Sequence, residues 1–152
     1  MSERKNASLY QNASKVLTTS PAEPEVAHKH FLSRLSFETD PSDVYHDLTN
    51  KVSGIVVIDA RTPEAYARGH VPGAINLPHR TIDSSTTASL LRDTVCVTYC
   101  DGVFCNASTK AAAKLTALGF KVKEMIDGME GWRKEGYQVE ETVMKMTIPA
   151  TR

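Results

Sequence analysis

Two runs of β-branched and apolar residues constrain the fold of this chain most strongly. The two runs are Gly54-Ile55-Val56-Val57-Ile58-Asp59 and Thr94-Val95-Cys96-Val97-Thr98-Tyr99. Both are almost continuously apolar or β-branched. Neither alternates apolar with polar residues, as a strand with one solvent-exposed face does. Such runs are typical of strands that are buried on both faces of a parallel sheet. Parallel neighbours need long crossover connections, which are usually helices. The sequence therefore predicts an α/β fold, an open parallel sheet with helices on both faces.

The segments around these two strands supply the crossovers. Asp40-Pro41-Ser42 provides a cap and a first-turn proline, and Thr62-Pro63-Glu64 provides a second helix start. A third helix is expected to open on a capping Ser108 and to close at Gly119. The expected helices are 41–50, 62–69, 84–91, 108–118 and 128–135, and the further expected strands are 74–77 and 120–125.

The ends of the chain differ from this middle part. Residues 1–36 are predicted to form a partly disordered arm, because the stretch up to about Glu25 is rich in Ser, Asn, Thr and Pro. A short helix is possible from Val26 to Leu35. Residues 37–138 are predicted to form the single domain and residues 139–152 a C-terminal tail.

Composition excludes several classes of partner. The 152 residues include 18 basic and 18 acidic side chains, so a formal net charge of zero predicts no nucleic-acid or membrane-surface partner. No apolar stretch approaches the roughly 20 residues that cross a bilayer, and the N-terminus lacks a signal-peptide core. The expected location is therefore cytoplasmic. Three cysteines do not resemble a secreted disulfide framework, which leaves chemistry or packing to explain them.

Cys100 occupies the position where open α/β sheets bind ligands, beyond the carboxyl end of a buried strand. The loop that follows leads into a helix N-terminus, which is expected to lower the thiol pKa, and inward-pointing loop amides would hold an anion. Position alone leaves a buried structural thiol equally open. Cys96 is expected to pack in the core, while Cys105 could be a second nucleophile, a resolving thiol or an apolar filler.

Other polar residues near this strand end have plainer interpretations. Asp59 and Arg61 could support the active loop but are expected mainly to satisfy loop backbone and each other. His70 is expected to be a hydrogen-bonded turn residue, and Gly102 either adopts a positive φ or marks a turn. Zinc usually needs closely paired ligands, which His70, His79, Cys100 and Cys105 do not supply, so no metal is expected.

Four motifs in order make the chain recognisable. These are Val57-Ile58-Asp59-Ala60-Arg61, then Gly69-His70-Val71-Pro72-Gly73-Ala74-Ile75-Asn76-Leu77-Pro78, then Val97-Thr98-Tyr99-Cys100, then Asp127-Gly128-Met129-Glu130-Gly131-Trp132. Together they closely resemble the rhodanese homology domain over about 37–137. The resemblance implies a single-domain sulfurtransferase in which Cys100 becomes a persulfide and no cofactor takes part.

The resemblance also implies the residues that bind the substrate and the partners of the reaction. The loop that cradles the persulfide would comprise Asp101, Gly102, Val103, Phe104, Asn106, Ala107 and Ser108, with Cys105 as a possible second thiol. Sulfur would come from a donor such as thiosulfate or mercaptopyruvate and pass to cyanide, a thiol or a protein acceptor.

The loop departs from the family pattern in ways that leave alternatives open. Common members have a shorter loop, often with an arginine, whereas 100–108 holds no basic residue and a second cysteine. An anionic donor would therefore depend on loop amides, on Lys110 or on Arg61. A cysteine phosphatase or arsenate reductase is disfavoured because that chemistry needs a loop arginine. A non-catalytic binding or regulatory module, and a redox role in which Cys105 attacks an oxidised Cys100, stay as alternatives.

Overall fold

The computed structural model describes residues 14–142, and the chain divides into two compact units between Arg34 and Leu35. In the first unit lie a 3-10 turn, η1 (Val16–Thr18), and most of helix α2 (Pro24–Phe37), which has no buried residue. The possible helix over 26–35 is confirmed and is somewhat longer than expected. Residues 1–13 of the arm that was predicted over 1–36 to be partly disordered lie outside the described residues.

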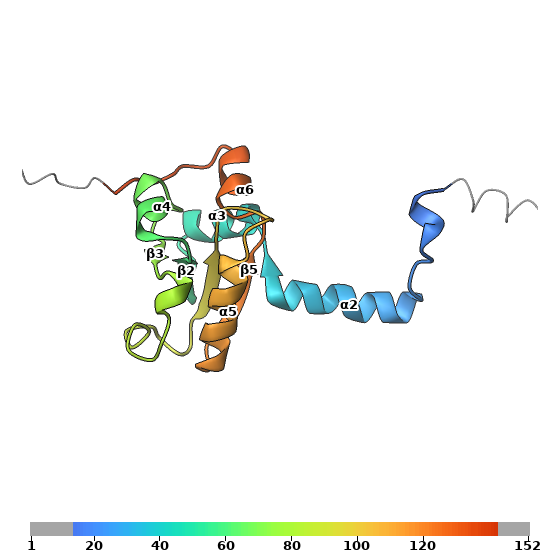
Figure 1. Ribbon diagram of the computed structural model, residues 1–152, viewed down its shortest axis with the longest axis horizontal. Coiled ribbons are helices and arrows are strands. Elements are labelled where there is room, and N and C mark those ends of the chain that lie inside the picture. The colour runs from blue at the N-terminus through green and yellow to red at the C-terminus, as the bar shows by residue number, and fades with distance from the viewer. Residues whose placement is uncertain (1–13, 143–152) are drawn as a thin grey trace, which may run out of the picture. The chain divides into compact units, whose positions relative to one another are not determined.

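The second unit is built on a five-stranded, entirely parallel sheet in the order β1-β5-β4-β2-β3 (Figure 1). The strands are β1 (Glu38–Thr39), β2 (Ile55–Asp59), β3 (Ile75–Asn76), β4 (Val95–Tyr99) and β5 (Lys121–Met125). The two apolar runs form the adjacent strands β2 and β4, with Val57 level with Val97. The predicted parallel α/β fold is therefore confirmed.

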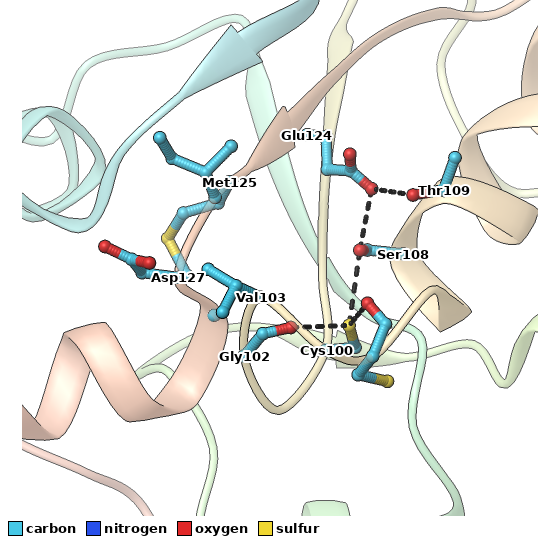
Figure 2. A pocket seen from close by; sticks show the side chains of 11 residues that line it. Cys100, Gly102, Val103, Ser108, Thr109, Glu124, Met125 and Asp127 are labelled. Carbon is cyan, nitrogen blue, oxygen red and sulfur yellow. Dashed lines mark hydrogen bonds between the residues drawn. The ribbon is translucent and has the colours of Figure 1, made fainter. Parts of the chain in front are cut away.

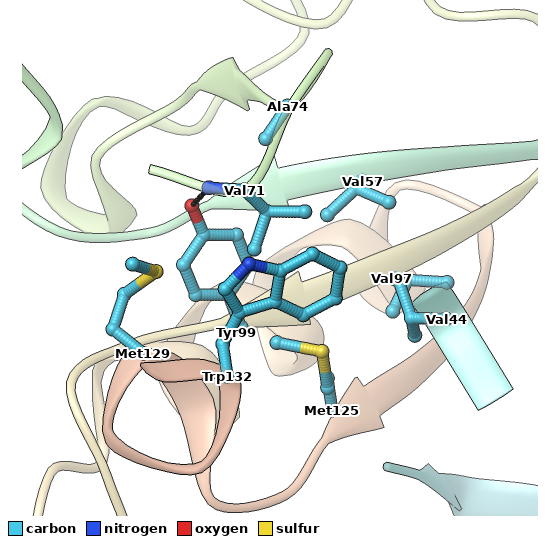
Figure 3. Packing of buried hydrophobic residues seen from close by; sticks show 9 residues of the cluster. All are labelled: Val44, Val57, Val71, Ala74, Val97, Tyr99, Met125, Met129 and Trp132. Atoms are coloured by element: carbon cyan, nitrogen blue, oxygen red, sulfur yellow. Dashed lines mark hydrogen bonds between the residues drawn. The ribbon is translucent and has the colours of Figure 1, made fainter. Parts of the chain in front are cut away.

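Helices cover both faces of this sheet. Val57, Val97 and Tyr99 pack on one face with residues of α3 (Pro41–Thr49) and α6 (Gly128–Lys134), including the fully buried Trp132 (Figure 3). On the other face, Ile58 and Cys96 pack with α5 (Ala107–Ala117). Cys96 is thus a core residue, as expected, and Trp132 is one as well. Because successive side chains of β4 point to opposite faces of the sheet, this one strand contributes residues to the hydrophobic core on each face.

Local capping explains where two of these helices begin. The Asp40 carboxylate accepts a hydrogen bond from the backbone N–H of Asp43 at 2.9 Å, and Pro41 is the first residue of α3. The Thr62 hydroxyl does the same for Ala65 at the start of α4 (Pro63–Arg68). Both starts agree with the sequence, since a side-chain acceptor satisfies an amide that has no partner in the first turn.

Two local predictions are wrong. Residues 84–91 form turns rather than a helix, because the Asp83 carboxylate accepts from the amides of Ser85 and Thr86 at 2.8 Å. These local bonds compete with helix formation. A short 3-10 helix, η2 (His79–Thr81), precedes them. In addition, α5 begins at Ala107 with Asn106 before it, so Ser108 lies inside the helix and its hydroxyl is not the cap.

The chain continues to contact the domain after α6. Tyr137 and Val139 pack against the first core cluster, and Glu140 forms an antiparallel bridge with His70. The His70 ring stacks on Tyr66 and bonds its carbonyl oxygen at 2.8 Å, as expected for a turn residue. The tail beyond residue 142 lies outside the described residues. Within residues 14–142, no helix is long and apolar enough to span a membrane.

Candidate active site

Cys100 directly follows β4 at the carboxyl edge of the sheet, and its side chain is only 2% exposed. The start of α6 fixes the backbone around it. The amides of Met129 and Glu130 donate to the carbonyl oxygens of Cys100 and Asp101 at 2.9 and 2.8 Å. Gly128 allows this approach, because a Cβ there would lie 2.1 Å from the Cys100 carbonyl oxygen. The base of the active loop is therefore held by backbone contacts between two distant segments.

Three oxygen atoms surround the sulfur of Cys100 (Figure 2). The carbonyl oxygen of Cys105 lies 3.0 Å from Sγ, the Ser108 hydroxyl 3.3 Å and the carbonyl oxygen of Gly102 3.9 Å. Within the loop 100–108, the backbone amide of Ser108 also interacts with the sulfur. The thiol itself donates to loop oxygens in this conformation, and a cradle of inward-pointing amides around a bound anion stays a prediction.

The protonation of Cys100 follows from these surroundings. Burial raises the pKa of the Cys100 thiol and Cys105 raises it further, whereas the hydrogen bonds that Ser108 can donate from its hydroxyl and its backbone amide act in the opposite direction. The predicted net lowering of this pKa is wrong, because burial outweighs the amide at the start of α5. Desolvation disfavours the thiolate, and a carbonyl oxygen stabilises the thiol that donates to it. Both effects favour the protonated thiol over the thiolate.

A pocket of about 160 Å³ opens beside Cys100 (Figure 2). Its walls come from the active loop, the start of α5, the end of β5 and the turn into α6. The lining residues are Cys100, Gly102, Val103, Cys105, Ser108, Thr109, Glu124, Met125, Ile126, Asp127 and Gly128. The two charged residues among them, Glu124 and Asp127, are both acidic. An anionic ligand therefore meets no basic side chain in this lining.

Sequence reasoning missed the residues that β5 and the turn after it contribute. Glu124 is the most informative of these, since its Oε2 accepts from the hydroxyls of Ser108 and Thr109, each at 2.7 Å. Glu124 is level with Thr98 near the end of the neighbouring strand β4. The predicted parallel order would have placed an end-of-strand Glu at the same edge as Cys100, had the register of β5 been known.

Asp59 and Arg61 form a buried network behind the loop. Arg61 Nη2 lies 2.7 Å from Asp59 Oδ2, and Nη1 lies 3.1 Å from the Asp101 carboxylate. The Tyr99 hydroxyl also donates to Asp59, at 2.8 Å. Burial opposes the charge of Arg61, but its hydrogen bonds with Asp59 outweigh burial and raise its pKa. Burial and then the Asp59 charge raise the pKa of Tyr99. The pair satisfies its own charges and also supports the loop.

The remaining loop residues divide between a tight turn and an exposed tip. Gly102 has no positive φ, but its carbonyl accepts from the Cys105 amide at 3.0 Å, and a Cβ at Gly102 would lie 2.4 Å from the Glu130 carboxylate. Val103 is 64% exposed and Phe104 fully exposed. Cys105 is a half-buried free thiol. Among the described residues, no three His, Cys, Asp or Glu side chains gather where they could hold a metal ion.

Comparison with known proteins gives two kinds of relative. The chain is 41% identical over 88 residues to the thiosulfate sulfurtransferase GlpE of Pseudomonas entomophila, covering 57% of this chain and 77% of that protein. It is 37% identical over 87 residues to the HTH-type transcriptional regulator Rv0324 of Mycobacterium tuberculosis, again covering 57% of this chain. The matched part spans only 38% of that regulator.

Solved structures and a family model agree on the fold. The BH2092 protein of Bacillus halodurans superposes with a TM-score of 0.77 at 47% identity, covering 79% of this chain and 88% of that one. A rhodanese-like domain from the Anabaena sp. Alr3790 protein superposes with a TM-score of 0.62 at 22% identity and covers 76% and 86%. The Rhodanese-like domain model matches residues 41–135. The chain therefore belongs to the rhodanese-like domain family.

Proposed function

We propose that this protein is a sulfurtransferase that carries sulfur as a persulfide on Cys100. The observation that supports this most directly is the position of the thiol. Cys100 ends the strand β4, its backbone is held by α6, and its sulfur lies beside an open pocket. Relatives with the name thiosulfate sulfurtransferase add support, because they match across the domain that contains this cysteine.

The reaction would proceed in two balanced displacements. The Cys100 thiol first loses its proton, and the thiolate attacks the outer sulfur of the donor, which departs as sulfite from thiosulfate or as an enolate from mercaptopyruvate. The new S–S bond makes Cys100 a persulfide anion. An acceptor such as cyanide then attacks the terminal sulfur, forms thiocyanate and returns Cys100 as a thiolate. The thiolate form is required for attack because it is the nucleophile.

The charge of the pocket bears on the donor. Thiosulfate is a dianion, whereas the pocket lining carries Glu124 and Asp127 and no basic residue. Arg61 already bonds Asp59, Asp101 and the carbonyl oxygen of Gly69. We therefore expect donors of lower negative charge, including a persulfide on a partner protein, to load Cys100 faster than thiosulfate does. A persulfide donor and a thiol acceptor fit the cytoplasm, which is the compartment we propose.

Intact-mass measurement after incubation with thiosulfate, mercaptopyruvate or an alkyl persulfide tests the function. Wild type and Cys105→Ser are expected to gain one sulfur that cyanide removes, while Cys100→Ser gains none. A sulfur that is lost only in Cys105→Ser would assign the nucleophile to the other thiol. If no variant takes up sulfur from any of the three donors, the catalytic proposal is wrong.

A non-catalytic regulatory module is the second candidate, and one comparison favours it. A relative at 37% identity is named a transcriptional regulator, in which this domain makes up about two fifths of the length. That role would leave Cys100 without sulfur uptake in the mass experiment. A redox role remains a further proposal: the Cys105 backbone lies within 3.0 Å of the Cys100 sulfur, and alkylation after mild oxidation would find both thiols blocked.

A further inference from the structure

The Ser108 hydroxyl lies between the Cys100 sulfur and the Glu124 carboxylate. It is 3.3 Å from Sγ and 2.7 Å from Oε2 of Glu124, and the Ser108 and Cys100 side chains are almost fully buried (Figure 2). A hydroxyl has one hydrogen and can accept through its lone pairs. An ionised carboxylate only accepts. The Ser108 hydrogen therefore goes to Glu124, and a lone pair faces the sulfur.

We propose that Glu124, acting through the Ser108 hydroxyl, is a positioning residue that holds Cys100 as a protonated thiol until a donor binds. This inference deepens the proposed sulfur transfer and rests on it for its biological meaning. Glu124 does not itself touch the sulfur. Its effect is to set the direction of the hydrogen bond that Ser108 makes with Cys100.

The neighbouring contacts favour a Ser108 hydroxyl that donates to Glu124 and accepts from Cys100. The Thr109 hydroxyl also donates a hydrogen bond to the same Oε2 at 2.7 Å, so this carboxylate oxygen accepts from two hydroxyls. The sulfur also faces the carbonyl oxygens of Cys105 and Gly102, which can only accept. The S–H group can donate to either of these carbonyls, whereas a thiolate would be opposed by both and supported by the Ser108 backbone amide. A Ser108 hydroxyl turned toward the sulfur would reverse this preference.

Other charged or titratable groups lie on the elements around Glu124 and Cys100, and each is a source of background charge. On β1, Glu38 is level with Glu124, and Asp127 lines the same pocket. The active loop carries Asp101 and Cys105, α6 carries Glu130, and α5 and β5 carry cations. Those cations are Lys110 and Lys114 on α5 and Lys121 and Lys123 on β5. Only Glu124 among the acids bonds the hydroxyl that touches the sulfur.

Alkylation of Cys100 as a function of pH is the test, because only the thiolate reacts with iodoacetamide. The background is Cys105→Ser, and the alkylated residue is identified by peptide mass. Glu124→Gln keeps the shape of the side chain but removes its charge. It is expected to move the titration midpoint of Cys100 to lower pH and to speed alkylation at pH 7 about tenfold. An unchanged or higher midpoint would overturn the proposal.

A matched control separates the effect of the hydrogen bonds from Glu124 through Ser108 to Cys100 from the effect of any negative charge in the pocket. Asp127→Asn makes the same acid-to-amide change in the same pocket, at a residue with φ 64° that asparagine tolerates. It is expected to speed alkylation much less than Glu124→Gln does. Equal effects would refute the role of Ser108. Thr109→Val, which removes the second donor to Glu124, is expected to change the rate in the same direction as Glu124→Gln but by less.

Combining the substitutions tests the link directly. In a Ser108→Ala background the extra effect of Glu124→Gln is expected to fall to about twofold or less, since the connecting hydroxyl is gone. A tenfold effect that persists would overturn the proposal. Alkylation does not need sulfur transfer. A change in alkylation rate without sulfur uptake would therefore reject the proposed function and leave the positioning role of Glu124. Sulfur uptake without a change in alkylation rate would reject the positioning role and leave the proposed function.

Discussion

The base and the tip of the active loop are built in contrasting ways. At the base, Cys100 and Asp101 accept two backbone hydrogen bonds from α6, and Arg61 bonds the Asp101 side chain. At the tip, Val103 and Phe104 are 64% and fully exposed. The base is fixed by residues from three parts of the chain, whereas the tip packs against almost nothing. Cys100 on such a base can keep its position while the exposed tip changes its contacts.

Breaking the buried ion pair behind the base is expected to have the largest effect. Asp59→Asn leaves the Arg61 guanidinium buried with one exposed carboxylate as its charged partner, and it weakens the bond from Tyr99. We expect the free energy of unfolding to fall by about 4 kcal/mol, as for other buried pairs that lose one member. Urea unfolding measures it. The control is Asp101→Asn, whose side chain is 62% exposed and which should cost about 0.5 kcal/mol.

A smaller loss is expected when the close approach of α6 is obstructed. Gly128→Ala places a Cβ against the Cys100 carbonyl at a residue with φ 50°. Left-handed strain and overpacking together should lower the free energy of unfolding by about 3 kcal/mol. Gly136→Ala is the control, because φ there is 76° but no atom lies within 4 Å of the added carbon. If both variants lose the same stability, the contact with Cys100 contributes nothing.

The smallest effect is expected at the tip. Phe104→Ser removes a ring that is fully exposed, so the free energy of unfolding should change by no more than about 0.5 kcal/mol. The same measurement on the three variants gives the ranking Asp59, Gly128, Phe104. A loss of about 2 kcal/mol or more at Phe104 would mean that the tip is packed in solution, and the contrast between base and tip would fail.

The sheet could be predicted from sequence because its signals are local. The β-branched runs that became β2 and β4, and the caps Asp40 and Thr62, each depend on a few neighbouring residues. Residues 84–91 misled this reasoning, since bonds of the Asp83 carboxylate to the following amides oppose a helix. Ser108 looked like a cap for a similar reason, because its true partner Glu124 lies 16 residues further on.

The site was less predictable than the fold because it depends on backbone direction and register. The position of Cys100 at a strand end was visible in the sequence. Whether amides or carbonyls of the loop 100–108 face its sulfur depends on individual peptide planes, which no residue pattern specifies. The low pKa expected for Cys100 failed mainly because the thiol is buried, and burial disfavours the thiolate. Glu124 was missed because Lys121-Val122-Lys123-Glu124 reads as an ordinary strand with polar positions.

The bonds that α6 makes with the Cys100 backbone also have a consequence for synthesis on the ribosome. The thiol emerges before the segment that holds its loop, since Gly128 to Glu130 follow it by nearly thirty residues. A nascent chain that ends before Glu124 carries Cys100 without that support and without the carboxylate that bonds Ser108. Its cysteine then behaves as an ordinary exposed thiol, open to oxidation and alkylation. Release of α6 completes the chemical protection of this residue.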